Sequence, residues 1–401
     1  MIDIPIHNGE VDTTPTEAGY DTEALNRLDN LFTSLIGEHQ LQGASYMLSR
    51  HGRTFANRAF GTLRQDEGSP PLQTDSIRRI ASITKMFTLV CILRLMEEGK
   101  LYLRQPVKDW IEEFKHATYE KINIYHLLTH TSGLHPDGGY FTEPYPAGWW
   151  DYEFAFEDYN DEGEVEHKQL SPGEAGAQKR SRWIKAMLAG PPISEPGESW
   201  NYSSAGYSLL GELIRRISGM SYEDYVKQTI IEPLGLTRTS FRVQEAMYDE
   251  VCVTNDWDLQ RLTDREDRTY LAPRAGGGLY STLADLDRFG RMLLGNGTLD
   301  GVKIISRKSV EMLTADQFTN GIRAYHWGEN LTDFHAGLGV TLGRVDDPFK
   351  GTTFLHEGAG RSALMIDKKE GLVAVFFVPT NVDWVPESMI SVKNIIWSGI
   401  Q

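Results

Sequence analysis

The stretch ASITKMFTLVCILRL, residues 81–95, places a serine and a lysine three positions apart at the start of an apolar run. The pattern from about Asp75 to Gly99 predicts a buried helix, because apolar residues occur on all sides of it. A lysine is costly in such a helix, since an unpaired buried ammonium must be neutralised or given a partner. The position of Lys85, one turn after Ser82, therefore needs a chemical explanation.

The composition is that of an ordinary globular protein, with 40% hydrophobic and 24% charged residues among 401. A net charge of -16 argues against nucleic-acid and anionic-membrane partners, since both favour basic surfaces. No signal peptide is recognisable, and no apolar stretch approaches the ~18 residues of a membrane span. We therefore expect a soluble, cytoplasmic protein with a small-molecule substrate. Its two cysteines, Cys91 and Cys252, form no metal-binding pair and are expected to be buried thiols.

Strand-like runs lie at both ends of the chain, and mainly helical patterns lie between them. Residues 43–62 contain two such runs joined at His51-Gly52, which predicts a hairpin. From about Gly337 onward, further strand-like runs are separated by tight turns. Helices are expected beside these strands, at residues 21–39 and 387–400.

This arrangement predicts an α/β domain that is completed by both ends of the chain, with a helical domain inserted. We place the α/β domain at residues 1–75 and 272–401, and the mainly helical domain at residues 76–271. One helix of the inserted part is predicted to end at Gly219, and its apolar stripe is formed by Leu209, Leu210, Leu213, Ile214 and Ile217.

Residues 136–180 differ from the rest, because they combine many aromatic and acidic residues without a regular period. Long irregular segments in compact domains are usually functional or disordered, so we expect an excursion or lid. Two interpretations are open: a lid packed by its own aromatic residues, or a pocket wall that selects an apolar or cationic acyl group. The aromatic residues concerned are Trp149, Trp150, Tyr152, Phe154, Phe156 and Tyr159.

The spacing of Ser82 and Lys85 suits nucleophilic catalysis. Residues three apart on a helix share one face, and a helix N-terminus places the positive end of the dipole near the hydroxyl. A serine hydroxyl is a poor nucleophile until a base takes its proton, and a desolvated lysine with a lowered pKa can do so. The motif alone is weak, since a capping serine and a lysine that reaches the surface would give the same letters.

Several further motifs resemble those of the serine β-lactamase and penicillin-binding-protein superfamily. Its Ser-x-x-Lys signature matches Ser82-Ile83-Thr84-Lys85. The segments INIYHLLTHTSGL, EPGESWNYSSAGYSLLGELI, GGGLYSTLADLDRF and HEGAG follow in the family's order. The branch that the chain resembles contains class C β-lactamases, D-alanyl-D-alanine carboxypeptidases, D-aminopeptidases and family VIII carboxylesterases. The resemblance implies an α/β (α+β), β-lactamase-like fold: an antiparallel sheet flanked by helices, plus an inserted, mainly helical domain.

The family's Tyr-x-Asn motif falls on Tyr202-Ser203-Ser204. By resemblance, Tyr202 shares the general-base and general-acid work with the lysine. A phenol beside Lys85 has its phenolate stabilised and can pass a proton between nucleophile and leaving group. An extended segment would send Tyr202 and Ser204 to the same side. Ser204 replaces the usual asparagine, and its shorter hydroxyl lacks the amide's fixed donors and acceptor for a substrate amide.

The family's Lys-Thr-Gly motif falls on His356-Glu357-Gly358, where an edge strand lies beside the substrate. Gly358 permits close approach of the backbone. By resemblance, the N–H of Ala359 joins that of Ser82 in an oxyanion hole. Lysine would supply a permanent charge for a substrate carboxylate, whereas His356 near neutral pH mostly does not. Arg361 could still receive a carboxylate, or be a solvated strand residue; both interpretations stay open.

Two other patterns invite a functional interpretation. His126 and His130 have the spacing of a metal pair, but no third ligand motif accompanies them. The run Gly276-Gly277-Gly278 lacks the Lys-Ser/Thr that follows in a phosphate loop, and is expected to let the backbone pack tightly near the cleft. We therefore expect no metal and no other cofactor.

The sequence thus predicts a serine hydrolase that acts through an acyl-enzyme on an ester or amide. The catalytic residues would be Ser82, Lys85 and Tyr202, and the oxyanion and substrate-binding residues Ala359, Ser204, His356 and Gly358. A carboxylesterase or D-specific amidase or peptidase is favoured. The alternatives are a β-lactamase or penicillin-binding carboxypeptidase, an acyltransferase of a biosynthetic pathway, and a non-catalytic binding or scaffold member.

Overall fold

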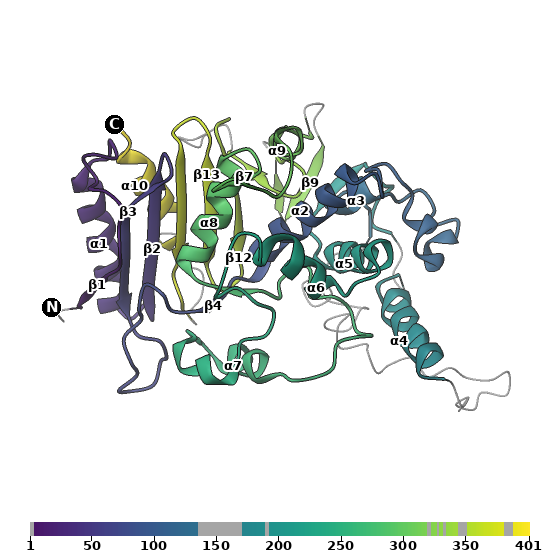
Figure 1. Cartoon of the computed structure of the whole chain (residues 1–401), viewed down its shortest axis with the longest axis horizontal. Helices are drawn as coiled ribbons and strands as arrows, with labels where there is room; N and C mark the ends of the chain where they lie inside the picture. The colour runs from purple at the N-terminus through teal and green to yellow at the C-terminus, as the bar shows by residue number, and fades with distance from the viewer. Residues whose placement is uncertain are drawn as a thin grey trace.

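Both ends of the chain contribute to one antiparallel sheet of seven strands, ordered β1-β3-β2-β14-β13-β12-β11 (Figure 1). The computed structural model describes residues 4–134, 171–188, 192–318, 322–326, 329–331, 334–343, 351–380 and 388–401. The bounds of the sheet strands are Ile6–Asn8 (β1), Gly43–Arg50 (β2), Arg53–Gly61 (β3), Thr341–Leu342 (β11), Thr353–Gly358 (β12), Ser362–Asp367 (β13) and Leu372–Phe377 (β14).

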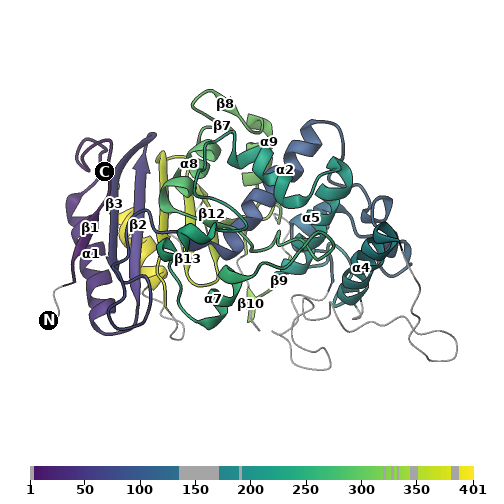
Figure 2. The ribbon, with the colours of Figure 1, turned by 60° about the horizontal axis from the view of Figure 1, so that its bottom comes forward.

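Helices cover both faces of this sheet (Figures 1 and 2). Helices α1 (Thr22–Gly37) and α10 (Ile390–Ser398) share one apolar cluster with the sheet, and α8 (Leu283–Leu294) shares another with its opposite face. Side chains of a strand alternate between faces. In β14, Ala374 and Phe376 belong to the first cluster, and Val373 and Val375 belong to the second. The continuous apolar run of this strand follows from burial on both sides.

A mainly helical part lies to one side of the sheet, with α2 (Thr84–Glu97) passing through its core. Helix α5 (Ser204–Ser218) packs against α2 through the predicted stripe and ends at Gly219, whose φ of 75° is the left-handed conformation that glycine favours. The other helices are α3 (Ile124–Leu128), α4 (Pro172–Met187), α6 (Tyr222–Val226), α7 (Asp256–Thr263) and α9 (Arg307–Thr314).

The predicted hairpin, the terminal helices and the late strands are confirmed. His51 and Gly52 form the two-residue turn between β2 and β3, both with positive φ. The expected α/β architecture, an antiparallel sheet flanked by helices, is also confirmed. The division into a discontinuous domain and an inserted domain stays a prediction.

The prediction of one helix from Asp75 to Gly99 is wrong at its start. Arg78 and Arg79 form a short strand, β4, which pairs with β6 (Tyr280–Ser281). The backbone N–H of Ile80 then donates to Leu279 O over 2.9 Å, so it is engaged outside any helix. A 3-10 turn, η1 (Ala81–Ile83), follows, and the α-helix begins only at Thr84. Ser82 therefore lies in the turn before the helix, not on the helix.

Part of the predicted irregular excursion is also helical, because α4 begins at Pro172. The aromatic residues singled out there, from Trp149 to Tyr159, lie outside the described residues. Within the part of the chain that is described, no helix is both long enough and apolar enough to cross a membrane. A cytoplasmic location stays a prediction.

Candidate active site

Ser82 and Lys85 meet where the η1 turn passes into α2. Ala81, just before the serine, has a φ of 44°, an uncommon left-handed conformation for a residue with a Cβ. This turn leaves Ser82 partly exposed, while Lys85 on the first turn of α2 is fully buried. Lys85 Nζ donates a hydrogen bond to Ser82 Oγ over 3.1 Å. The predicted contact between the two side chains is therefore present.

Lys85 has two more hydrogen-bond acceptors, from distant parts of the chain. Its Nζ donates to Ser204 Oγ over 3.0 Å and to Gly276 O over 2.7 Å. The nitrogen also lies 4.7 Å from the centroid of the Tyr202 ring, within the range of a cation–π contact. Burial of the amine is thus offset by directed contacts, which answers why a lysine is tolerated at this depth.

The glycine run at 276–278 makes this convergence possible. A Cβ on Gly276 would lie 2.9 Å from Ser204 Cβ, so a larger residue would push apart the two acceptors of Lys85. The same segment is fastened to α2, because Thr88 Oγ1 donates to Ala275 O over 2.8 Å. The N–H of Leu279 donates to Thr84 Oγ1 over 3.1 Å. The predicted tight packing is confirmed for Gly276 and for Gly278, whose Cβ would lie 2.4 Å from Arg274 Cβ, but a Cβ on Gly277 would meet nothing closer than 3.6 Å.

Tyr202 lies on the segment between β5 (Ser199–Asn201) and α5, and His130 holds that segment in place. Nδ1 of His130 accepts from the N–H of Ser203 over 3.0 Å, and its carbonyl accepts from the N–H of Asn201 over 2.8 Å. The His130 and Tyr202 rings pack with centroids 4.7 Å apart. Sequence reasoning missed this supporting role, and the only signal for it was the position of His130 within the HTSGL segment.

His126 has a different role, at the start of α3. Its N–H donates to Asn123 Oδ1 over 3.0 Å, and its Nδ1 accepts from the N–H of Asn123 over 3.3 Å, capping α3. Burial lowers the pKa of His126 to about 4, so the ring is neutral at pH 7. No group of three or more potential metal ligands occurs among the residues described.

Strand β12 ends beside the segment that leads to Ser82. A Cβ on Gly358 would lie 2.3 Å from Ile80 O, so only glycine fits this approach. Ser362 Oγ, at the start of β13, donates to Ile80 O over 3.4 Å. Ala359 follows Gly358 and is exposed, and the turn closes through a bond from Arg361 N to Gly358 O of 2.9 Å. The turn that carries Ala359 thus adjoins the η1 turn.

His356 is buried in β12 and uncharged. Its Nδ1 lies 2.6 Å from Glu357 O, and because a carbonyl only accepts, Nδ1 is the protonated nitrogen. Burial, followed by the nearby charge of Lys85, lowers the pKa of His356 to about 3. The ring therefore carries no charge across the neutral range, as its replacement of lysine suggested.

Of the remaining candidate residues, some have their predicted position and others do not. Ser204 Oγ accepts a hydrogen bond from Lys85 Nζ, and Ser204 is the first residue of α5, not part of an extended segment. Its predicted contact with substrate stays a prediction. Arg361 lies in the turn between β12 and β13 with a φ of 63°, so it is not a strand residue. Its role as a carboxylate receptor stays a prediction. Cys91 and Cys252 are buried free thiols, as predicted.

Comparison with known proteins supplies independent evidence for the family of this chain. The family model described as Beta-lactamase matches residues 28–387. Esterase EstB of Burkholderia gladioli is 32% identical over 233 residues, 57% of this chain and 54% of that protein. Penicillin-binding protein 4* of Bacillus subtilis is 29% identical over 356 residues, 84% of this chain and 68% of that protein.

Among solved structures, the octameric penicillin-binding protein homologue from Pyrococcus abyssi aligns with a TM-score of 0.64 at 25% sequence identity. The alignment covers 89% of this chain and 74% of that one. Together with the family match, this confirms the resemblance drawn from the sequence motifs.

Gly358→Ala tests the close approach of β12 to the Ser82 segment. The added methyl would collide with Ile80 O and Ser362 Oγ, so the strand or the η1 turn must shift. We expect kcat/KM for a p-nitrophenyl ester to fall about 100-fold or more, the scale of a lost oxyanion donor. Gly37→Ala is the matched control, because its Cβ would meet nothing closer than 4.0 Å. Wild-type kcat/KM in folded Gly358→Ala would contradict this geometry.

Proposed function

As the chain belongs to the beta-lactamase family and is a serine hydrolase working through an acyl-enzyme, we propose that it cleaves uncharged esters or amides. Ser82 is the nucleophile in this proposal, and Lys85 and Tyr202 move the protons. The observation that carries it is the buried Lys85 amine, bonded at once to Ser82, Ser204 and Gly276.

These three contacts suit an amine that acts as a base. An uncharged amine has two N–H donors and one lone pair. A carbonyl such as Gly276 O can only accept, and a hydroxyl such as Ser204 Oγ can accept as well, so both donors are used. In this uncharged form the contact with Ser82 reverses, so that the Ser82 hydroxyl donates to the lone pair of Lys85 Nζ over the same 3.1 Å. The N-termini of α2 and α5 both lie beside the amine.

The proposed reaction has two halves. In acylation, Ser82 Oγ bonds to the substrate carbonyl carbon while its proton passes to Lys85 Nζ. The carbonyl oxygen becomes an oxyanion held by the N–H groups of Ser82 and Ala359. Collapse breaks the bond to the alcohol or amine, which leaves with a proton delivered through Lys85 and Tyr202. In deacylation, water attacks the acyl carbon by the same route and restores Ser82.

The neutral state of His356 supports uncharged acyl donors. A strand lysine at this position would offer a fixed cation to a substrate carboxylate, whereas a ring with a pKa of about 3 offers none at pH 7. EstB is described as an esterase, which agrees with this preference. Penicillin-binding protein 4* is named for penicillin binding, so β-lactam acylation is the second candidate.

Covalent labelling tests the nucleophile. We expect a fluorophosphonate probe to add its mass once per chain to the wild type and not at all to Ser82→Ala. The Ser82→Ala variant should also lose p-nitrophenyl butyrate hydrolysis. Ser34→Ala is the control, because it removes an exposed serine hydroxyl on α1. This variant should be labelled by the probe and should hydrolyse the ester as the wild type does. No adduct and no ester turnover in the wild type would contradict the hydrolase proposal and favour a non-catalytic binding role.

A substrate panel then separates the remaining alternatives. The panel contains neutral short-chain esters, D-amino-acid amides and a chromogenic cephalosporin. We expect kcat/KM to be highest for the neutral substrates. Alcohols or amines are then added during ester turnover as acyl acceptors. Acyl transfer is indicated if the transfer products exceed the free acid. Preferred turnover of the cephalosporin would contradict the proposed substrate class.

His356→Lys should shift this preference toward acyl donors that bear a carboxylate. The ratio of kcat/KM for a carboxylated ester to that for its neutral counterpart is expected to rise about 10-fold, the value of ~1.4 kcal/mol of added charge pairing. His356→Gln keeps a neutral side chain and should leave the ratio unchanged. Because each ratio compares two substrates of the same variant, a general loss of activity affects both kcat/KM values equally and leaves the ratio unchanged. An unchanged ratio in His356→Lys would show that position 356 does not face the acyl group.

A further inference from the structure

We propose that Arg78 is a positioning residue for the oxyanion turn, fixing the turn that carries Ala359 relative to the strand that leads to Ser82. The proposal rests on the proposed function, because it takes the N–H groups of Ser82 and Ala359 as the oxyanion donors. It adds a residue outside the serine, lysine and tyrosine set.

Arg78 bridges the two segments directly. It is the first residue of β4, four positions before Ser82, and its side chain is buried, with 3% exposure. Its Nη2 donates to Gly360 O over 2.6 Å, and Gly360 is the residue after Ala359. Gly360 has a φ of 81°, and a Cβ there would lie 3.0 Å from Arg78 Nη2. The guanidinium is therefore pressed against the turn.

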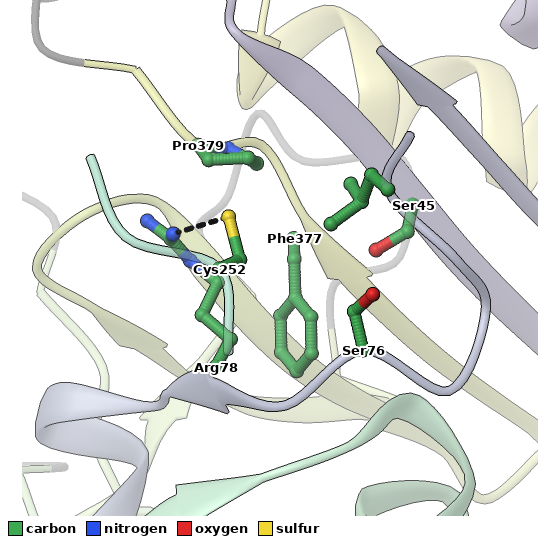
Figure 3. A pocket seen from close by; sticks show the side chains of 7 residues that line it. Ser45, Ser76, Arg78, Cys252, Phe377 and Pro379 are labelled. Atoms are coloured by element: carbon green, nitrogen blue, oxygen red, sulfur yellow. Dashed lines mark hydrogen bonds between the residues drawn. The ribbon is translucent and has the colours of Figure 1, made fainter. Parts of the chain in front are cut away.

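A second contact fixes the guanidinium on its other side. Figure 3 shows Arg78 Nη1 donating to Cys252 Sγ, over 3.5 Å, in a narrow pocket also lined by Phe377 and Pro379. Cys252 is itself anchored, because its N–H donates to Ile77 O over 2.8 Å, next to β4. Gln42 Nε2 donates to the same sulfur over 3.6 Å. The guanidinium plane is thus held from two directions.

The charge of Arg78 is unusual for its burial. Burial raises the pKa of the Cys252 thiol, so this neighbour is neutral and does not compensate the guanidinium. Among the described residues, no carboxylate lies within ion-pair distance of Arg78, whereas neighbouring Arg79 pairs with Asp258 at 3.0 Å. The charge of Arg78 helps to lower the pKa of Asp258, but a buried charge with no counterion in direct contact is costly. An oxyanion forming beside Ala359 would supply a compensating negative charge in the transition state.

Arg79 provides a matched comparison within the same strand. Successive strand residues face opposite sides, and Arg79 contacts Asp258 and the Trp257 ring, away from the oxyanion turn. If the arginines of β4 served only to hold the fold, removing either would have similar effects on catalysis. If Arg78 positions the turn, only its removal weakens transition-state binding.

The test compares Arg78→Met with Arg79→Met, using enzyme concentrations set by fluorophosphonate titration. The readouts are kcat/KM for p-nitrophenyl butyrate and the Ki of phenylboronic acid. That acid bonds through boron to Ser82 Oγ and mimics the tetrahedral intermediate. For Arg78→Met we expect kcat/KM to fall about 10- to 100-fold and Ki to rise at least about 10-fold, with both near wild type in Arg79→Met. A purely structural role would reduce the titrated sites without changing Ki per site.

Unchanged kcat/KM and Ki in Arg78→Met, or equal losses in both variants, would overturn the proposal. If Arg78→Met does not fold, Arg78→Lys carries the test, because it keeps the charge but loses the two-sided fork. An intermediate rise in Ki, about 3- to 10-fold, is then expected, and an unchanged Ki overturns the proposal. Loss of labelling in the wild type itself would contradict the proposed function instead, so the two failures are distinguishable.

Discussion

The hydrogen bonds of the buried Lys85 amine are the constraint on which the rest of the site depends. They connect the η1 turn, the start of α5 and the glycine run at 276–278, three segments that are far apart in sequence. Each segment must be placed to within a few tenths of an ångström for the three contacts to coexist. The close packing of Gly276 on Ser204 and the fastening of the glycine segment to α2 follow from that demand.

Charge is arranged around this amine in a consistent way. His356 is held neutral by burial and by the neighbouring lysine, so β12, the strand proposed to face the substrate, carries no fixed cation at that position. Arg78, by contrast, retains its charge behind the oxyanion turn, where it bonds to Gly360 O. In the proposed mechanism, the positive charge of Arg78 therefore stabilises the reacting oxygen, whereas the acyl-binding strand has no positive charge at position 356. Such an arrangement favours a neutral substrate that becomes negative only during reaction.

Much of this site could be predicted from sequence because its chemistry is encoded in short, ordered motifs. Ser82, Lys85 and the glycine run were noticed by residue type and spacing, and the strand with Gly358 was found by its resemblance to a family motif. The start of the helix at residue 75 was mispredicted, since its apolar period continues through residues that the structure pairs with β6. Local periodicity cannot reveal such a pairing, which joins residues about 200 positions apart.

The supporting residues were hidden for a related reason. His130 acts on Tyr202 through a backbone bond to Ser203, and Arg78 acts on the oxyanion turn through a bond to Gly360 O. Neither contact leaves a pattern in the sequence, because the partner is a main-chain group that any residue would provide. Ser204 shows the same limit, since its hydroxyl marks a departure from the family motif, while its bond to Lys85 emerges only in three dimensions.

The claim that the Lys85 amine activates Ser82 is tested most directly by the rate at which Ser82 is acylated in Lys85→Met. Methionine preserves the unbranched shape of the side chain but has no proton-accepting amine. Pre-steady-state acylation by a p-nitrophenyl ester, measured on folded protein, is predicted to slow by about 100- to 10,000-fold relative to wild type. Acylation of Lys85→Met within about threefold of the wild-type rate would contradict the account.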